Sequence, residues 1–189
     1  MKKLIPLLLL ILGAAAPVHA DDYVIDSKNA HAFIQFRISH LGFSWLYGRF
    51  NDFDGTFSYD EKNPAAAKVA VNIRTASIDS NNAERDKHLR SDDFLDTGKF
   101  PNAKFVSTAY EDKGAGKGTL KGKLTLHGVT QPVSIDVEHV GTGPDPWGGV
   151  RRGFFGTTKL VLKDFGINYD LGPAARTVYL DLSVEGIKQ

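Results

Sequence analysis

The sequence predicts an all-β domain, and two patterns along the chain carry that prediction. Apolar and polar residues alternate with a period of two in several separate segments, as they do in strands with one buried face. Short connections rich in glycine and proline separate these segments, so neighbouring strands are expected to pair antiparallel. One segment, 81–90, instead carries charges at helical spacing and predicts a short surface helix inserted between strands.

The composition limits the function classes that need to be considered. The chain has 189 residues, 42% hydrophobic and 24% charged, which suits one ordinary globular domain. It contains no cysteine, so disulfides, thiol nucleophiles and thiolate metal sites are excluded. Lys and Arg number 23 against 22 Asp and Glu, so charge gives no reason to expect nucleic-acid or anionic-membrane binding.

The first twenty residues predict a secretory signal peptide. A short basic segment precedes an uncharged Leu- and Ala-rich run, and Val18-His19-Ala20 is a small-x-small cleavage pattern. The run is too short to span a bilayer, which needs about 20 residues. Cleavage after Ala20 would export one soluble domain, residues 21–189, and no later stretch predicts a membrane span.

The alternating segments predict strands along most of the mature chain. Strands are expected, in order, at 32–38, 69–73, 120–126, 133–137 and 178–184. The turn residues at 128–132 predict a hairpin, and the glycine-rich segments 114–118 and 141–146 predict loops.

The segment 81–90 has the marks of a solvated helix. Asn81 with Glu84 matches a capping box, and Asp86 with Arg90 has the i,i+4 spacing of an ion pair. Leu89 is expected to dock on the strands. The favoured interpretation is a helix held by ion pairs over one mouth of the domain, and the alternative makes a carboxylate and a histidine of this segment an acid–base pair.

Strands with one apolar face can close into a barrel or stack as a sandwich, and closure removes exposed edges. Nine of the 20 aromatic residues lie between positions 33 and 59. If this segment were one extended strand, five of them would share a face: Trp45, Tyr47, Phe53, Phe57 and Tyr59. Alternation alone leaves open whether such side chains fill a closed core or line a ligand cavity.

Several sequence blocks resemble the YceI-like family, and they occur in the family's order across the whole mature chain. The densest blocks are His31–Phe33, Arg37–Gly42, Phe53–Phe57, Ala83–Arg90, Asp93–Leu95, Phe100–Pro101, Gly122–Thr130 and Lys163–Ile167. The segment 44–57 is especially similar to the Escherichia coli member. The resemblance implies a periplasmic protein with an extended, lipocalin-like antiparallel β-barrel of about eight strands. It also implies a bound polyisoprenoid lipid with a prenyl phenol or quinone-like ring.

If the barrel encloses a lipid, the apolar strand faces should form the channel wall. The expected wall residues are Ile34, Phe36, Ile38, Phe53, Phe57, Val71, Ile73, Leu124, Leu126, Val133, Ile135, Val137, Leu160, Leu162, Leu180 and Leu182. Head-group or mouth contacts are expected from His40, His127 and Trp147. No histidine pair has zinc-site spacing, so no metal site is predicted.

Three functions remain open from the sequence. The leading one is a non-enzymatic carrier or store for an isoprenoid quinone or its precursor. The second is an enzyme that modifies such a lipid with His40, His127 or Asp86 as proton carriers. The third is a stress-protective structural protein with incidental lipid, and a homodimer is compatible with all three.

Overall fold

The computed structural model describes residues 20–29 and 31–189. The predicted signal peptide, apart from Ala20, lies outside the described residues. The strands are β1 (Asp21–Ile25), β2 (Phe33–His40), β3 (Ser44–Phe50), β4 (Phe53–Tyr59), β5 (Lys68–Arg74), β6 (Ile78–Asp79), β7 (Asn102–Gly114), β8 (Lys117–Leu126), β9 (Val129–Pro144), β10 (Val150–Val161) and β11 (Thr177–Lys188). Helix α1 spans Ala83–Leu89, and 3-10 turns span Pro64–Ala66, Thr75–Ser77, Leu162–Phe165 and Pro173–Ala175.

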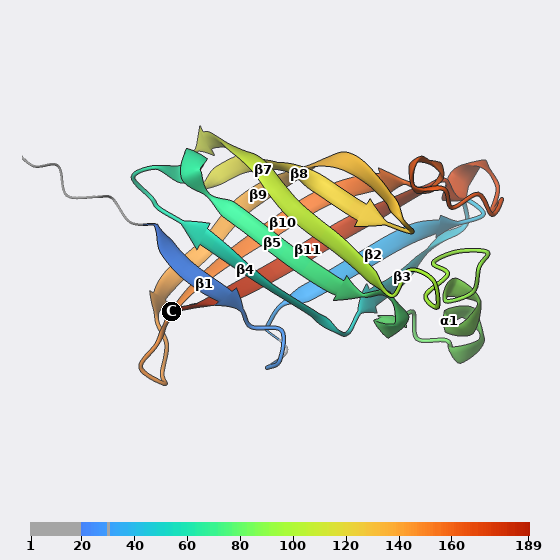
Figure 1. The fold of residues 1–189 in the computed structure, drawn as a ribbon, viewed down its shortest axis with the longest axis horizontal. Helices are drawn as coiled ribbons and strands as arrows, with labels where there is room; N and C mark the ends of the chain where they lie inside the picture. The colour runs from blue at the N-terminus through green and yellow to red at the C-terminus, as the bar shows by residue number, and fades with distance from the viewer. Residues whose placement is uncertain (1–19, 30) are drawn as a thin grey trace, which may run out of the picture.

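These strand segments form one closed antiparallel barrel with eight strand positions (Figure 1). Three positions are each divided between two consecutive segments along the barrel wall: β1 with β2, β3 with β4, and β5 with β6. Closure occurs at β11, which pairs with β10 on one edge and with both β2 and β1 on the other. The all-β prediction and the eight-strand barrel are confirmed, and a sandwich is excluded.

The barrel is elongated, and its two ends differ (Figure 1). We call the end that holds the start of β1 and the end of β11 the terminal end. The opposite end, where α1 lies, is the helical end. It also holds the β2–β3 turn and the connection from β10 to β11. A 12-residue strand such as β11 extends about 40 Å, so the enclosed space is long and narrow.

Period-two alternation places the core inside the barrel as predicted. On β8, for example, Leu120, Leu124 and Leu126 point inward and are buried, whereas Lys123 between them is exposed. Phe165 in the turn after β10 is almost fully buried and covers the helical end.

The predicted shared face of the aromatic cluster is wrong for two residues. Trp45 and Tyr47 on β3 are exposed, whereas Phe53 and Phe57 on β4 are buried. The strand breaks between β3 and β4, where the backbone N–H of Asn51 donates to the carbonyl of Ser77, 3.1 Å away. This break shifts the alternation by one residue, so odd-numbered side chains change from the outer to the inner face.

Two turns also differ from the sequence prediction. The β8–β9 hairpin turns at His127 and Gly128, both with positive φ, and β9 already begins at Val129. The segment 141–144, expected to be a loop, continues β9 as strand. No helix in the described part of the chain is long and apolar enough to cross a membrane.

The helix forms where predicted but with a different cap. Asn82, not Asn81, accepts the backbone N–H of Arg85 at 2.9 Å, and α1 begins one residue later at Ala83. Asn81 instead has a positive φ and precedes the cap.

Candidate functional site

Two apolar cavities lie end to end inside the barrel. One, of about 160 Å³, is near the terminal end, and the other, of about 470 Å³, is near the helical end; we call them the terminal cavity and the helical cavity. The order of wall residues along β11 shows the arrangement: Val184 lines the terminal cavity, Leu180 lines both, and Val178 lines the helical cavity. The residues common to both cavities are Ile34, Ile73, Leu124, Leu160 and Leu180. Together the cavities form one channel along the barrel.

Glycines on the inner face help to keep this channel open. A Cβ atom at Gly48 would lie 2.3 Å from the ring of Phe36, and one at Gly186 would lie 2.3 Å from the ring of Phe57. The absence of these two side chains lets each ring lie against the wall instead of across the lumen. The large aromatic content therefore does not fill the barrel completely.

The terminal end is closed by a buried arginine among tyrosine rings. Arg152 points inward from β10 and is only 6% exposed. Its Nη2 donates to Glu61 Oε1 at 2.6 Å, and its Nε donates to the hydroxyl of Tyr23 at 3.3 Å. Its guanidinium lies 4.8 Å from the centre of the Tyr59 ring. The pairing with Arg152 lowers the pKa of the Glu61 carboxyl, so both partners remain charged at neutral pH.

Two phenol groups stand between this plug and the terminal cavity. Tyr59 and Tyr110 line the cavity, with ring centres 6.2 Å apart at nearly a right angle. Burial raises the pKa of both phenols, so they are neutral at physiological pH. The terminal cavity is otherwise almost wholly apolar and suits a hydrocarbon chain.

The helical cavity has a more polar rim. His40 at the end of β2 lines it, as do Ser80, Arg85 and His88 around α1. Its deeper wall is apolar and continues into the shared residues. The channel therefore combines an apolar interior with hydrogen-bonding groups at its helical end.

Helix α1 is fixed beside this rim by hydrogen bonds to the chain around β6. The buried carboxylate of Asp86 accepts the backbone N–H of Ser80 at 2.8 Å and also its hydroxyl. Arg85 Nε donates to the Ser80 hydroxyl at 2.8 Å, and Arg90 Nη2 donates to the carbonyl of Ile78 at 2.6 Å. The predicted position over a mouth is confirmed, but the predicted Asp86–Arg90 ion pair is replaced by bonds to the neighbouring segment.

A contact between α1 and the connection to β11 completes the rim. His88 Nε2 lies 2.8 Å from Asp93 Oδ2, and its ring packs edge-on against Tyr169 and Phe94 at 5.2 and 4.9 Å. His88 is thus paired with Asp93, in the segment after α1, and Asp86 with Ser80, so Asp86 and His88 do not pair with one another.

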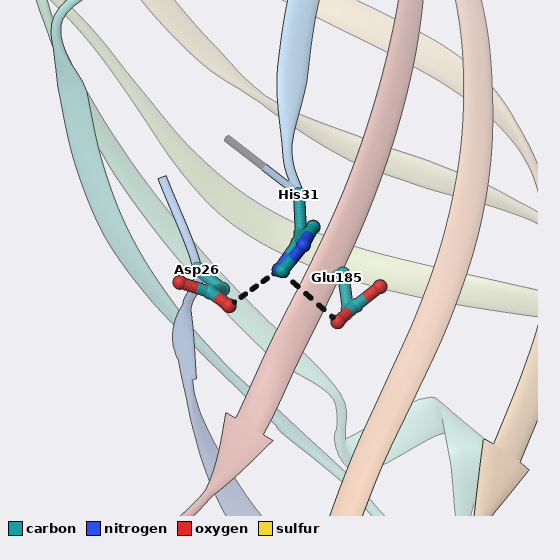
Figure 2. Close-up of side chains that lie close together, drawn as sticks. All are labelled: Asp26, His31 and Glu185. Atoms are coloured by element: carbon teal, nitrogen blue, oxygen red, sulfur yellow. Dashed lines mark hydrogen bonds and ion pairs between the residues drawn. The ribbon is translucent and has the colours of Figure 1, made fainter. Parts of the chain in front are cut away.

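A separate polar cluster lies on the outer wall, where β1 ends. His31 Nδ1 is 3.0 Å from Asp26 Oδ2 and 3.9 Å from Glu185 Oε1 (Figure 2). The three ligand atoms are close enough to hold a cation. However, Arg151 Nη1 already donates to the same Asp26 oxygen at 2.7 Å and to the same Glu185 oxygen. A guanidinium therefore occupies the place of a cation, and the arrangement is an ion-pair network.

All sixteen expected wall residues line the channel. Those of the terminal cavity are Ile34, Phe53, Phe57, Val71, Ile73, Leu124, Val133, Ile135, Val137, Leu160, Leu180 and Leu182. The helical cavity adds Phe36, Ile38, Leu126 and Leu162. Their contact with a ligand stays a prediction.

Only one of the three expected mouth residues lines a cavity. His40 lies at the helical cavity. His127 lines neither cavity; its Nδ1 is 3.2 Å from the carbonyl oxygen of Phe165, which it bonds at the turn after β10. Trp147 lies in the β9–β10 turn, 74% exposed, with the guanidinium of Arg151 5.1 Å from its ring centre. Trp147 lines neither cavity, and its role as a channel lip stays a prediction.

Several wall residues were not among those expected from the sequence, and for some of them the reason is a bulge that interrupts the alternation. Between Ser107 and Ala109 the pairing of β7 with β8 shifts, so Phe105 and Tyr110 both point inward despite their odd and even numbers. A second shift, between β9 and β10, precedes Phe154. Missed wall residues include Tyr59, Val69, Phe105, Tyr110, Leu120, Phe154, Val184, Leu46, Phe94 and Leu171.

Comparisons with known proteins agree with this architecture. The model of the YceI-like domain matches residues 23–186. A UPF0312 protein of Shewanella denitrificans is 60% identical over 193 residues, covering the whole of both chains. The crystal structure of a Campylobacter jejuni YCEI protein superposes with a TM-score of 0.72 at 29% identity, over 80% of this chain and 90% of that one. A polyisoprenoid binding domain from Saccharophagus degradans has the same fold, with a TM-score of 0.62 at 16% identity, over 88% of this chain and 98% of that one.

Proposed function

The chain belongs to the YceI-like family, and from this membership we propose that it binds a long polyisoprenoid lipid in the barrel channel and carries or stores it. The observation that carries the proposal is the end-to-end arrangement of two apolar cavities with five common wall residues. A compact ligand would fill one cavity, whereas a long, thin, unbranched or methyl-branched chain can occupy both. The polyisoprenoid-binding neighbour supports the same ligand class.

The energetics of such a ligand favour tight binding. Each methylene transferred from water to an apolar wall contributes about 0.8 kcal/mol before entropic costs. A lipid of about 40 heavy atoms, at about 0.3 kcal/mol per atom, would bind with about 12 kcal/mol, which corresponds to a nanomolar dissociation constant. No catalytic group is needed for this role, and we assign binding rather than catalysis.

The polar rim gives the ligand an orientation. The prenyl chain lies along the channel, and a phenol or quinone-like ring lies at the helical end beside His40, where an oxygen substituent can form a hydrogen bond. The predicted signal peptide supports a periplasmic location. A soluble carrier there would shield an isoprenoid quinone or its precursor from water.

A chain-length series tests the proposal on the unaltered protein. Delipidated protein is titrated with benzoquinones that carry one to eight prenyl units, and the shift in melting temperature is measured. Affinity should rise with each added unit until the channel is full, and a bulky sterol should give no shift. Equal responses to short and long chains, or no response to any, would contradict the proposal.

A channel-blocking variant locates the site. Leu124 lies at the junction of the two cavities, so Leu124→Trp should weaken binding of the long quinone by at least about tenfold. The matched control is Val106→Trp, on the exposed outer face of the adjacent strand. Binding that survives Leu124→Trp in a folded protein would place the ligand elsewhere.

A further inference from the structure

The turn between β2 and β3 exposes two large apolar side chains at its tip. Leu41 is 60% exposed, and Phe43 is 85% exposed. Leu41 and Gly42 both have positive φ, and the N–H of Phe43 donates to the carbonyl of His40 at 2.9 Å, as in a type I′ turn. Asparagine, aspartate or glycine is preferred at the first of these positions, because leucine is strained there. Leu41 is therefore unfavourable in two ways, because its apolar side chain is exposed to water and its backbone conformation is strained.

This tip stands beside the mouth of the helical cavity. His40, Leu46 and Tyr47, which flank the turn, all line that cavity. The far edge of β3 pairs with β6 only at Arg49 and Phe50, so the rest of that edge faces the gap that α1 borders. In Figure 1 the hairpin reaches the helical end, opposite the start of β1 and the end of β11. A partner surface that contacts the tip would therefore also cover the channel mouth.

The charges of the hairpin suit a phosphate-bearing surface. No Asp or Glu occurs between Ser27 and Asn51. Arg37 and Arg49 point outward from the two strands, and the Arg37 guanidinium lies 4.8 Å from the ring centre of Trp45. Each arginine also has an acidic neighbour at the edge of ion-pair distance, Asp181 at 3.7 Å from Arg37 and Asp79 at 4.0 Å from Arg49. At a bilayer interface, apolar side chains insert deepest, whereas Trp, Tyr and Arg lie nearer the headgroups. The hairpin has the same order, with apolar side chains at its tip and Trp, Tyr and Arg farther along its strands.

We infer that the β2–β3 tip docks the helical end onto a lipid bilayer, with Leu41 and Phe43 inserted among the headgroups and the channel mouth facing the membrane. This inference rests on the proposed function, because a water-insoluble isoprenoid resides in a membrane. Contact at the mouth lets the chain pass from bilayer to channel without crossing water. The tip residues do not line the channel, so docking and ligand binding are separable.

A vesicle flotation experiment tests the docking. The full mature protein is mixed with phosphatidylcholine vesicles that contain a long-chain prenylated benzoquinone, and both bound protein and extracted quinone are measured. The variant is Leu41→Asn/Phe43→Ser, in which asparagine suits the positive φ of the turn. The control is Val140→Ser/Trp147→Ser, which removes two equally exposed side chains, 71% and 74%, on β9 and the β9–β10 turn near the terminal end. Thermal unfolding verifies that each variant is folded.

The tip variant should bind vesicles at least about tenfold more weakly and extract quinone more slowly, while the control behaves as the unaltered protein. All three should take up the quinone equally from a detergent dispersion. Undiminished flotation of the tip variant would overturn the docking inference. So would failure of the unaltered protein to float, which would favour a protein partner at the mouth. Failure to take up quinone from detergent would instead contradict the proposed function.

Discussion

Asp26 is a carboxylate whose pKa is set by its neighbours at the end of β1. Burial by itself raises the pKa of this group, but hydrogen bonds from Arg151, His31 and Asn29 outweigh burial and hold the pKa at about 2. Asp26, Asn29 and His31 lie in the segment between β1 and β2, and the bond from Arg151 connects this segment to β10. The network therefore closes the barrel wall at the point where one strand ends and the next has not begun.

The Asp26 network makes stability depend on acid. Because the folded pKa lies below the ordinary aspartate value of 3.8, the contribution of Asp26 to stability is fully present above about pH 4 and is lost as pH falls toward 2. A shift of this size corresponds to about 2 kcal/mol of unfolding free energy. Asp26→Asn should reduce stability at pH 7 by about that amount and flatten the loss between pH 4 and 2, as urea unfolding across this range would measure.

The matched control is Asp92→Asn, which removes an exposed carboxylate after α1. It should leave both the neutral-pH stability and the acid dependence nearly unchanged. An Asp26→Asn protein with the acid profile of the unaltered chain would show that Asp26 does not carry this dependence.

Single residues also show where sequence-based prediction works. Leu124 and Leu180 could be assigned to the inner wall, because period-two alternation fixes which face of a strand is buried. The Asp26 network could not be predicted, since its partners lie more than a hundred residues apart and meet only after the barrel closes. His40 lies at the channel mouth because it is the last residue of β2. His127 follows β8 and instead bonds the carbonyl of Phe165, in the turn that covers the helical end.

At the scale of elements, helix α1 depends on its hydrogen bonds more than on its length. It has only seven residues, too few to be stable alone in water. Asp86→Ala would leave the buried N–H of Ser80 without its acceptor, at a cost of about 1–3 kcal/mol. Hydrogen exchange of the α1 amides should become faster, and cleavage by trypsin within α1 should increase.

Glu84→Ala is the comparison within the same helix, because Glu84 is exposed and alanine is a good helix former. It should change neither exchange nor cleavage appreciably. If the two alanine variants exchange alike, the Asp86–Ser80 bonds do not hold the helix in place.

The strand elements were predicted better than their interruptions. The expected segments at 69–73, 120–126, 133–137 and 178–184 all lie within strands. The break after Phe50 and the shift near Ser107 were not predictable, because each depends on pairing with a distant segment. Each irregularity reverses which residues face inward, and this explains both the misplaced Trp45 and Tyr47 and the missed Tyr110.

For the whole molecule, alternation and turn composition were sufficient to predict an all-β domain, but closure required more. A barrel and a sandwich produce the same local pattern; the removal of exposed edges and the clustered aromatic residues favoured a barrel, and the family resemblance implied it. The interior stays open where inward glycines let aromatic rings lie against the wall, and the plug formed by Arg152 closes the channel at one end. These features depend on three-dimensional packing, so the sequence alone left a closed core as an alternative.

Native mass spectrometry of protein purified from cells shows whether the channel holds a long lipid. The full chain is expressed with its predicted signal peptide, and masses under native and denaturing conditions are compared. We expect an additional mass in the native spectrum that matches a prenyl phenol or quinone and disappears on denaturation. A ligand-free protein that also fails to take up added isoprenoid would show that the channel does not bind such a lipid and that these residues form a closed core.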